Sequence, residues 1–234
     1  MALPKRFYKD ATVAPIEGGY TVHLDDKPVR TPLGLALLLP VFPLAEAVVS
    51  EWQAQDKTIN PASMPLCGFA NTAIDRVGKE RSVVMANLLH YAETDLLCYR
   101  AEEPADLVAR QNEQWQPVLD WAAWALDVHL EVTSGVLPLT PSPKALQAIS
   151  DSLNKLDDMT LTAVASIAAA TGSFILALAV SENHIGADQA FEMSLLDESF
   201  QKERWGEDAE AAARNQHLKD DMNAAVLFLS LLRQ

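Results

Sequence analysis

Acidic side chains gather around a single Trp-Gly pair near the end of the chain. They are Glu198, Glu203, Glu207, Asp208 and Glu210, and they surround Trp205 and Gly206. Carboxylates beside an aromatic residue could bind a metal ion, act as general acid and base, or hold a basic surface of a partner protein. A structural interpretation is also available, in which the glycine ends one helix and the acids begin the next, where the helix dipole favours negative charge. Because no histidine supports the cluster, we favour the structural junction and the partner contact over catalysis.

The remaining sequence offers few residues for catalysis. The histidines stand at positions 23, 90, 129, 184 and 217, and none belongs to the H-E-x-x-H or E-x-x-H patterns of helix-borne metal sites. The sequence also lacks a glycine-rich phosphate loop, a dinucleotide fingerprint and a nucleophile elbow. We therefore expect no catalytic residue, no cofactor and no metal. The alternative is an enzyme of unknown class that uses the acidic cluster around Trp205.

A second aromatic candidate is Trp52, at the end of an amphipathic helix expected over residues 43–52. Leu44, Ala47 and Val48 share the apolar face of this helix. A tryptophan here would most often fill a core, because it buries a large area and needs only one partner for its indole N–H. Tryptophan is also a favoured anchor of protein interfaces. We favour the core, and we keep Trp52 among the candidate partner-binding residues.

Composition limits the classes of partner. The chain has 234 residues, 49% of them apolar, so one or two domains can bury a core without disulfides. Cys67 and Cys98 lie far apart in the sequence and form no metal-binding pair. The net charge of −14 and the isoelectric point near 4.7 oppose nucleic-acid binding, which requires clustered Lys and Arg. The same charge favours a positively charged or apolar protein partner.

The elements that would carry these residues change in character along the chain. Residues 7–39 alternate between apolar and polar positions and are interrupted by Gly18-Gly19 and Asp25-Asp26, which is typical of antiparallel strands. After Pro40 the apolar period becomes that of helices. We therefore predict an α+β protein with a small β-rich N-terminal domain at 1–62, containing one helix, and a larger all-helical bundle at 63–234.

The segment from Met159 to Ser181 carries no charged residue and is long enough to cross a bilayer. Its content of Ala, Thr and Ser, with Gly172 in the middle, favours a central helix of a bundle surrounded by protein. We expect no stable membrane insertion. The N-terminal residues resemble neither a secretory signal nor an Arg-rich presequence, so we expect a cytoplasmic protein.

Nine short motifs resemble the ATP12 chaperones in identity, order and spacing. They are Arg6-Phe-Tyr8, Gly18-Gly19-Tyr20, Leu24-Asp25, Thr31-Pro32, Leu44-Ala45-x-Ala47-Val48-x-x-Glu51-Trp52-x-x-Gln55, Thr94-Asp95-x-x-Cys98-Tyr99-Arg100, Glu102-Glu103-Pro104, Trp115-x-Pro117 and Trp205-Gly206. A single item such as Trp-Gly is weak evidence, but nine motifs in register are specific and cover nearly the whole chain.

The resemblance implies a molecular chaperone for assembly of the F1 sector of ATP synthase, with no enzymatic activity. Family members bind the unassembled α subunit and shield it until it joins β. A bacterial member would be cytoplasmic, and a processed eukaryotic form would lie in the mitochondrial matrix. The simplest such chaperone is a monomer. The family also implies an important acidic residue near Trp-Gly, which we carry over to Glu203, with Glu198 and Glu207 as alternatives.

Overall fold

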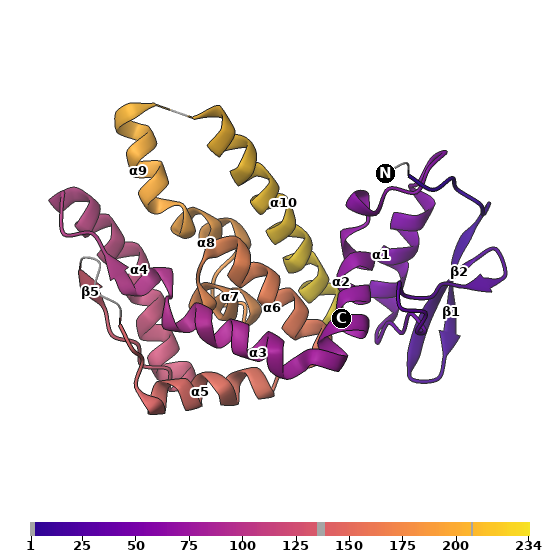
Figure 1. Cartoon of the computed structure of the whole chain (residues 1–234), viewed down its shortest axis with the longest axis horizontal. Coiled ribbons are helices and arrows are strands. Elements are labelled where there is room, and N and C mark those ends of the chain that lie inside the picture. The colour runs from indigo at the N-terminus through magenta and orange to yellow at the C-terminus, as the bar shows by residue number, and fades with distance from the viewer. Residues whose placement is uncertain (1–2, 135–138, 207) are drawn as a thin grey trace. The chain divides into compact units, whose positions relative to one another are not determined.

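A computed structural model describes residues 3–134, 139–206 and 208–234. The chain begins with a three-stranded antiparallel sheet and continues almost entirely as helices (Figure 1), which confirms the predicted α+β class. The strands are β1 (Ala11–Ile16), β2 (Gly19–Leu24) and β3 (Lys27–Pro28). A two-stranded parallel pair, β4 (Tyr99–Arg100) with β5 (Thr133–Ser134), lies among the helices.

The sheet is shorter than the sequence pattern predicts. The first strand begins at Ala11 rather than Phe7, and residues 35–39 form only isolated bridges, of which one joins Tyr20 to Leu39. The turn between β1 and β2 requires glycine, because a Cβ on Gly19 would lie 2.4 Å from the carbonyl oxygen of Leu39. This close approach explains Gly19, and a φ of +84° explains Gly18, whereas the sequence identified the pair only as a turn.

Ten α-helices are described. They are α1 (Phe42–Gln53), α2 (Pro65–Thr72), α3 (Gly78–Glu93), α4 (Ala105–Leu126), α5 (Pro143–Asn154), α6 (Asp158–Thr171), α7 (Phe174–Ser181), α8 (Ala187–Ser194), α9 (Leu196–Trp205) and α10 (Ala209–Leu232). The helix predicted over 43–52 corresponds to α1, with Leu44 and Val48 buried as its period requires.

The uncharged segment is two helices rather than the single helix expected. Gly172 adopts a φ of +67°, which ends α6, and the Ser173 hydroxyl accepts a hydrogen bond from the Leu176 N–H at 3.0 Å to begin α7. All eight side chains of α7 are buried, so its surroundings are protein. Within the described residues, no helix has both the length and the apolar content needed to cross a membrane.

The described chain divides into two compact units. Unit 1 comprises Met1–Arg81, Asp158–Ala163 and Ala224–Gln234, and unit 2 comprises Ser82–Asp157 and Val164–Asn223. Helices α6 and α10 therefore contribute residues to both units. The domain boundary expected between residues 62 and 63 stays a prediction.

Candidate functional site at the junction of α9 and α10

The Trp-Gly pair lies where α9 ends and α10 begins. Gly206 has a φ of +91°, a conformation that favours glycine, and Trp205 is the last residue of α9. Asp208 then begins the next helix, because its Oδ1 accepts a hydrogen bond from the Glu210 N–H at 2.9 Å. The junction therefore has the helix end and the acidic helix start that the sequence indicated. Glu207 lies outside the described residues.

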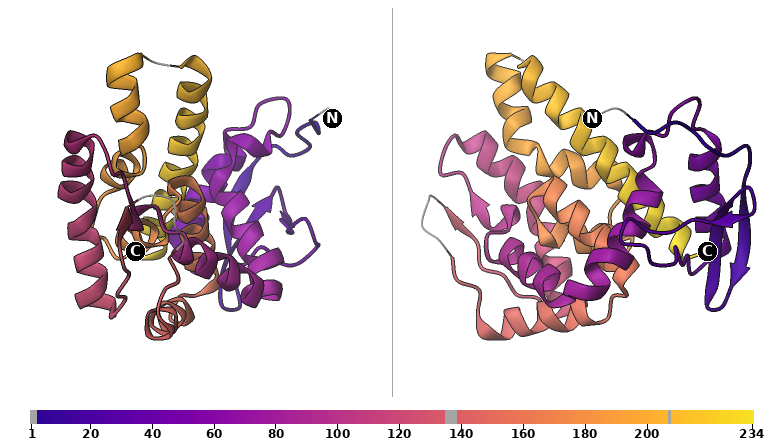
Figure 2. Two further views of the ribbon diagram at one scale, coloured as in Figure 1. Left: turned by 60° about the vertical axis from the view of Figure 1, so that its left-hand side comes forward. Right: turned by 45° about the vertical axis from the view of Figure 1, so that its right-hand side comes forward.

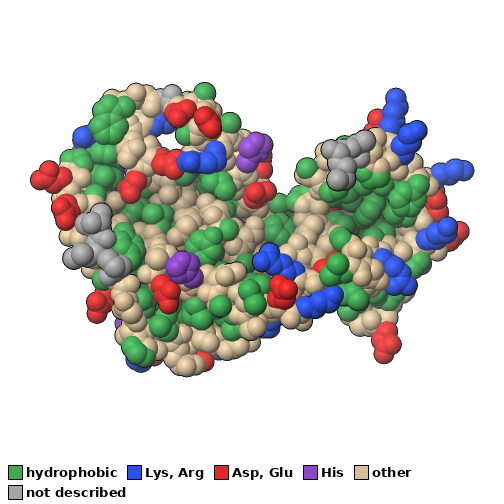
Figure 3. Space-filling view, in the orientation of Figure 1, with side chains coloured by type: hydrophobic (Ala, Val, Ile, Leu, Met, Phe, Trp, Pro, Cys, Tyr) green, Lys and Arg blue, Asp and Glu red, His purple; other side chains and the backbone are tan. Residues whose placement is uncertain are grey.

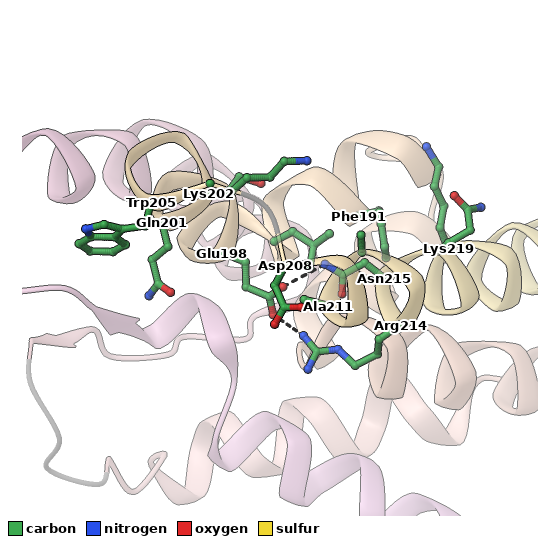
Figure 4. Close-up of a pocket in the computed structure, with 15 residues that line it drawn as sticks. Phe191, Glu198, Gln201, Lys202, Trp205, Asp208, Ala211, Arg214, Asn215 and Lys219 are labelled. Carbon is green, nitrogen blue, oxygen red and sulfur yellow. Dashed lines mark hydrogen bonds and ion pairs between the residues drawn. The ribbon is translucent and has the colours of Figure 1, made fainter.

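Trp205 is exposed, as is Trp124 on α4 of the same unit. The Trp205 side chain is 77% exposed, whereas Trp115 is completely buried and donates its indole N–H to the carbonyl of Met193 at 2.9 Å. Figure 4 shows the Trp205 ring directed away from the polar groups of the neighbouring helix. An exposed ring of this size contributes little to the core and is available to a partner.

The last turns of α9 are held against α4 by two ion pairs around one aromatic ring. Arg110 lies 2.8 Å from Glu203, and Arg204 lies 2.8 Å from Asp106. Both guanidinium groups also face the buried ring of Phe200, with Arg110 at 5.2 Å and Arg204 at 4.3 Å from its centroid. We call these five residues the α4–α9 clamp, and it fixes the helix end that carries Trp205.

The clamp also sets the charge state of Glu203. The hydrogen bond from Arg110 holds the pKa of this carboxyl below its usual range, and it raises the pKa of Arg110. Glu203 is therefore ionised at neutral pH and is poorly suited to donate a proton as a general acid. Among the residues described, no three His, Cys, Asp or Glu side chains are grouped so that they could hold a metal ion.

Glu198 joins α9 to α10 rather than belonging to the clamp. Its carboxylate accepts hydrogen bonds from Arg214 at 2.9 Å and from the amide of Asn215 at 3.0 Å (Figure 4). These contacts cross a groove of about 700 Å³ between the two helices. The groove is lined by Phe191, Leu195, Glu198, Ser199, Gln201, Lys202, Trp205, Gly206, Asp208, Ala211, Ala212, Arg214, Asn215, Gln216 and Lys219.

Trp52 belongs to unit 1, whereas the other described candidates belong to unit 2. Its ring meets the Tyr8 ring edge to face at 5.7 Å, and the Tyr8 hydroxyl donates to the Trp52 carbonyl oxygen at 2.6 Å. The buried indole nitrogen of Trp52 has no hydrogen-bond partner among the described residues. The contacts with Tyr8 tie Trp52 to its own unit.

The structure gives a role in the packing of unit 2 to two groups of residues that the sequence analysis did not list as candidates. The clamp residues Asp106, Arg110 and Phe200 carried no signal of their own, because Arg110 and Glu203 are 93 positions apart. Asp95 did carry a signal, since it stands in the Thr94-Asp95 motif. It is fully buried, and its carboxylate accepts from the Leu97 N–H at 3.0 Å, the Ser173 hydroxyl at 2.8 Å and the Ile175 N–H at 2.9 Å.

The net negative charge of the chain comes entirely from unit 2. Unit 1 holds ten Lys and Arg and ten Asp and Glu, so its formal charge is zero. Unit 2 holds the remaining eight Lys and Arg and 22 Asp and Glu, and therefore the whole net charge of −14. Figure 3 shows acidic side chains over the helices of unit 2 and hydrophobic side chains gathered over part of unit 1.

Comparison with known proteins places the chain in a family. The model of the family described as ATP12 chaperone protein matches residues 5–123. The chain is also similar to the crystal structure of Atp12 from Paracoccus denitrificans, with 41% identity and a TM-score of 0.94, over 98% of this chain and 99% of that one. A mutant of the same Paracoccus protein gives 40% identity, a TM-score of 0.94 and 98% coverage of both chains. The Atu1473 protein of Agrobacterium tumefaciens gives 42% identity and a TM-score of 0.93, over 98% of this chain and 87% of that one. Identity at this level over nearly the full length shows that this chain belongs to the ATP12 chaperone family.

Proposed function

We propose that this protein is an assembly chaperone of the F1 sector of ATP synthase, which binds the unassembled α subunit and prevents its aggregation until β replaces it. Family membership supports the general role, and the identity of the client rests on the nine motifs shared with ATP12 chaperones. We further propose that it acts as a monomer in the cytoplasm of a bacterium, without catalysis.

Such a chaperone must bind its client without high affinity. A subunit of a permanent assembly exposes a large and mainly apolar interface before assembly, and an uncovered surface of this kind aggregates. The chaperone must cover that surface, but it must also yield to the β subunit, which offers more contact. Binding by a few well-placed residues meets both conditions, since a few anchors carry most of the energy of an interface.

The observation that carries the proposed site is the exposed Trp205 on a helix end that the α4–α9 clamp holds in place. Trp205 is the proposed direct contact with the client. Glu203 acts with Arg110 to position that end of α9, while Glu198 and Asp208 lie along the adjoining groove. Trp52 is proposed to support this function from unit 1, by packing against Tyr8.

The test is aggregation of the cognate F1 α subunit, measured by light scattering after dilution from denaturant. We expect the wild-type protein to suppress scattering near an equimolar ratio, and Trp205→Ala to lose most of that effect. Trp124→Ala is the matched control, because Trp124 is 78% exposed, lies on α4 of the same unit and is absent from the groove lining.

Three outcomes would contradict the proposal. If the wild type leaves α unprotected, or protects only the β subunit, the proposed client is wrong. If Trp124→Ala and Trp205→Ala lose equal activity, a general loss of exposed aromatic surface explains the effect and the proposed site is wrong. Circular dichroism of both variants establishes that each is folded.

A further inference from the structure

The stretch of chain between β3 and α1 places apolar side chains on the surface of unit 1. The sequence contains no charged residue from position 31 to position 45. Five consecutive residues of this stretch, from Pro32 to Ala36, are all exposed, and Leu38 and Phe42 are exposed farther along. We call residues 32–42 the apolar segment. An exposed apolar run of this length promotes association and is avoided on protein surfaces unless it has a function.

The first half of the apolar segment is a loop that Thr31 and Asp75 hold in one conformation. The Thr31 hydroxyl donates to the Asp75 carboxylate at 2.6 Å and accepts from the Leu35 N–H at 3.1 Å. The other carboxylate oxygen of Asp75 accepts from the Leu33 N–H at 2.9 Å. Gly34 makes the turn with a φ of +82°, a conformation that favours glycine. The loop backbone is therefore held in place, while the Leu33 side chain at its tip is 61% exposed.

The second half of the apolar segment is fixed on β2 and α1. Leu39 and Tyr20 of β2 exchange two backbone hydrogen bonds, of 2.9 and 2.8 Å. Leu39 is buried, and its neighbour Leu38 points to the opposite side and is exposed, as alternate residues of an extended chain do. The rings of Tyr20 and Phe42 meet edge to face, with 5.3 Å between their centroids. Helix α1, which begins at Phe42, packs against β1 and β2 (Figure 2).

We propose that the apolar segment is a binding surface of unit 1 for the apolar interface that an unassembled F1 α subunit exposes. The inference rests on the proposed function and adds a contact in unit 1 to the one proposed at Trp205. Leu33 and Leu35, on the loop that Asp75 holds, are the anchors of this contact. Because the loop is ordered before binding, contact with the client loses little conformational entropy there.

The charges in and beside the apolar segment favour an apolar protein surface over other partners. The segment has no charged side chain, and the nearest charges along the chain, Arg30 and Glu46, are of opposite sign. Segments that bind membrane surfaces usually combine apolar residues with several Lys or Arg, which this segment lacks. A second copy of the chain would bring a second net charge of −14 and would be repelled. The interface of a subunit from a permanent assembly is mainly apolar and matches the segment in chemistry.

The two anchor leucines and a third exposed leucine of unit 1 allow a matched test. Leu227 lies on α10, is also exposed and belongs to unit 1, but it is remote in sequence from the apolar segment. Binding of refolded cognate F1 α subunit to the immobilised protein is measured by surface plasmon resonance. We expect the double variant Leu33→Gln with Leu35→Gln to weaken binding by about tenfold, because it removes two apolar anchors. The control Leu227→Gln should stay within about twofold of the wild type. Circular dichroism and thermal unfolding establish that each variant is folded.

The chemistry of the contact is tested with salt. Salt screens interactions between charges, but the apolar segment has none. The ratio of the dissociation constant of the double variant to that of the wild type should therefore be the same at low and at high salt. A ratio that falls toward one as salt rises would show that the leucines act through a charged contact, and would overturn the apolar description.

The results separate this inference from the proposed function. If the wild type binds α and the double variant binds equally well, or if Leu227→Gln loses as much as the double variant, the apolar segment is not a client surface, although the chaperone function stands. If the wild type does not bind α, the proposed function fails and this inference fails with it. Flotation of the wild type, but not of the double variant, with phosphatidylcholine vesicles would assign the segment to a membrane surface instead.

Discussion

Units 1 and 2 differ in their net charge and in the exposure of their family-motif residues. In unit 1, the guanidinium of Arg6 donates to the backbone carbonyls of Tyr8, Lys9 and Gln55. The carboxylate of Glu51 accepts from the Leu66 and Cys67 N–H groups, both at 2.8 Å, where α2 begins. These family-motif residues satisfy the backbone of their own unit, and the unit has no net charge.

Unit 2 also contains motif residues that bond to its own backbone. In addition, it has exposed residues that do not contribute to its packing. Asp95 and Trp115 are buried and hydrogen bonded, as the motif residues of unit 1 are. Trp205 belongs to the same set of motifs and is exposed. The whole net charge lies in the same unit, and so does the first half of α10, in which no residue is buried. The difference indicates that the polar motif residues of unit 1 mainly support its own structure, and that unit 2 also has a motif residue available to a partner.

The largest expected effect separates the two motif tryptophans of unit 2. Trp115→Ala should lower the free energy of unfolding by about 3–5 kcal/mol, because it removes a fully buried ring and leaves the Met193 carbonyl without its donor. Trp205→Ala should change it by less than about 0.5 kcal/mol. Urea denaturation measures both. Equal losses for the two variants would remove the distinction between structural and exposed motif residues.

The next effect concerns the pH dependence of stability. Burial raises the pKa of Asp95 to about 6, against hydrogen bonds that lower it. Between about pH 4 and 6 the folded protein therefore binds more protons at this site than the unfolded chain does. The contribution of Asp95 to stability is fully present below about pH 4 and is lost as pH rises through 6, by about 3 kcal/mol at most.

Asp95→Asn isolates this contribution from those of other carboxyl groups, which titrate in both proteins. We expect the wild type's advantage over Asp95→Asn in unfolding free energy to shrink as pH rises from 4 to 7. Denaturant titrations at fixed pH values give this difference. A difference that stays constant across the range would show that Asp95 does not titrate there.

A smaller effect tests the role of motif residues in unit 1. Arg6→Lys should cost about 1–2 kcal/mol, because one ammonium group cannot reach the three carbonyl oxygens that the guanidinium holds. Arg30→Lys is the matched control, since Arg30 makes a single exposed hydrogen bond to Gly34. Chemical denaturation should place the control within about 0.5 kcal/mol of the wild type. Similar losses at both positions would argue against a special role for Arg6.

The smallest effect on stability, but an informative one for binding, is expected at the α4–α9 clamp. Glu203 and Arg110 are both largely exposed, so their pair contributes little to folding. If Glu203 acts by positioning α9, Glu203→Ala, Arg110→Ala and the double variant should weaken binding of the α subunit to a similar extent. Additive losses in this double-mutant cycle would instead indicate that Glu203 contacts the client directly.

The sequence by itself determined the fold class, the family and the position of α1. The apolar period of 3.6 residues is a local property, and for this reason α1 could be predicted within one residue at each end. Nine motifs in register identified the family without structural information, because order and spacing along the chain are also properties of the sequence alone.

The tertiary structure decided which side chains form contacts and which remain exposed. The sequence predicted one helix over the uncharged segment, whereas the fold has two, and the carboxylate that caps the second, α7, comes from Asp95, 78 to 80 positions away. The acids near Trp205 look alike in the sequence, yet Arg110 engages Glu203 while Arg214 engages Glu198. Periodicity shows which residues share a helical face, but only packing between distant segments decides what covers that face. The exposure of Trp205 is therefore a property of the folded chain.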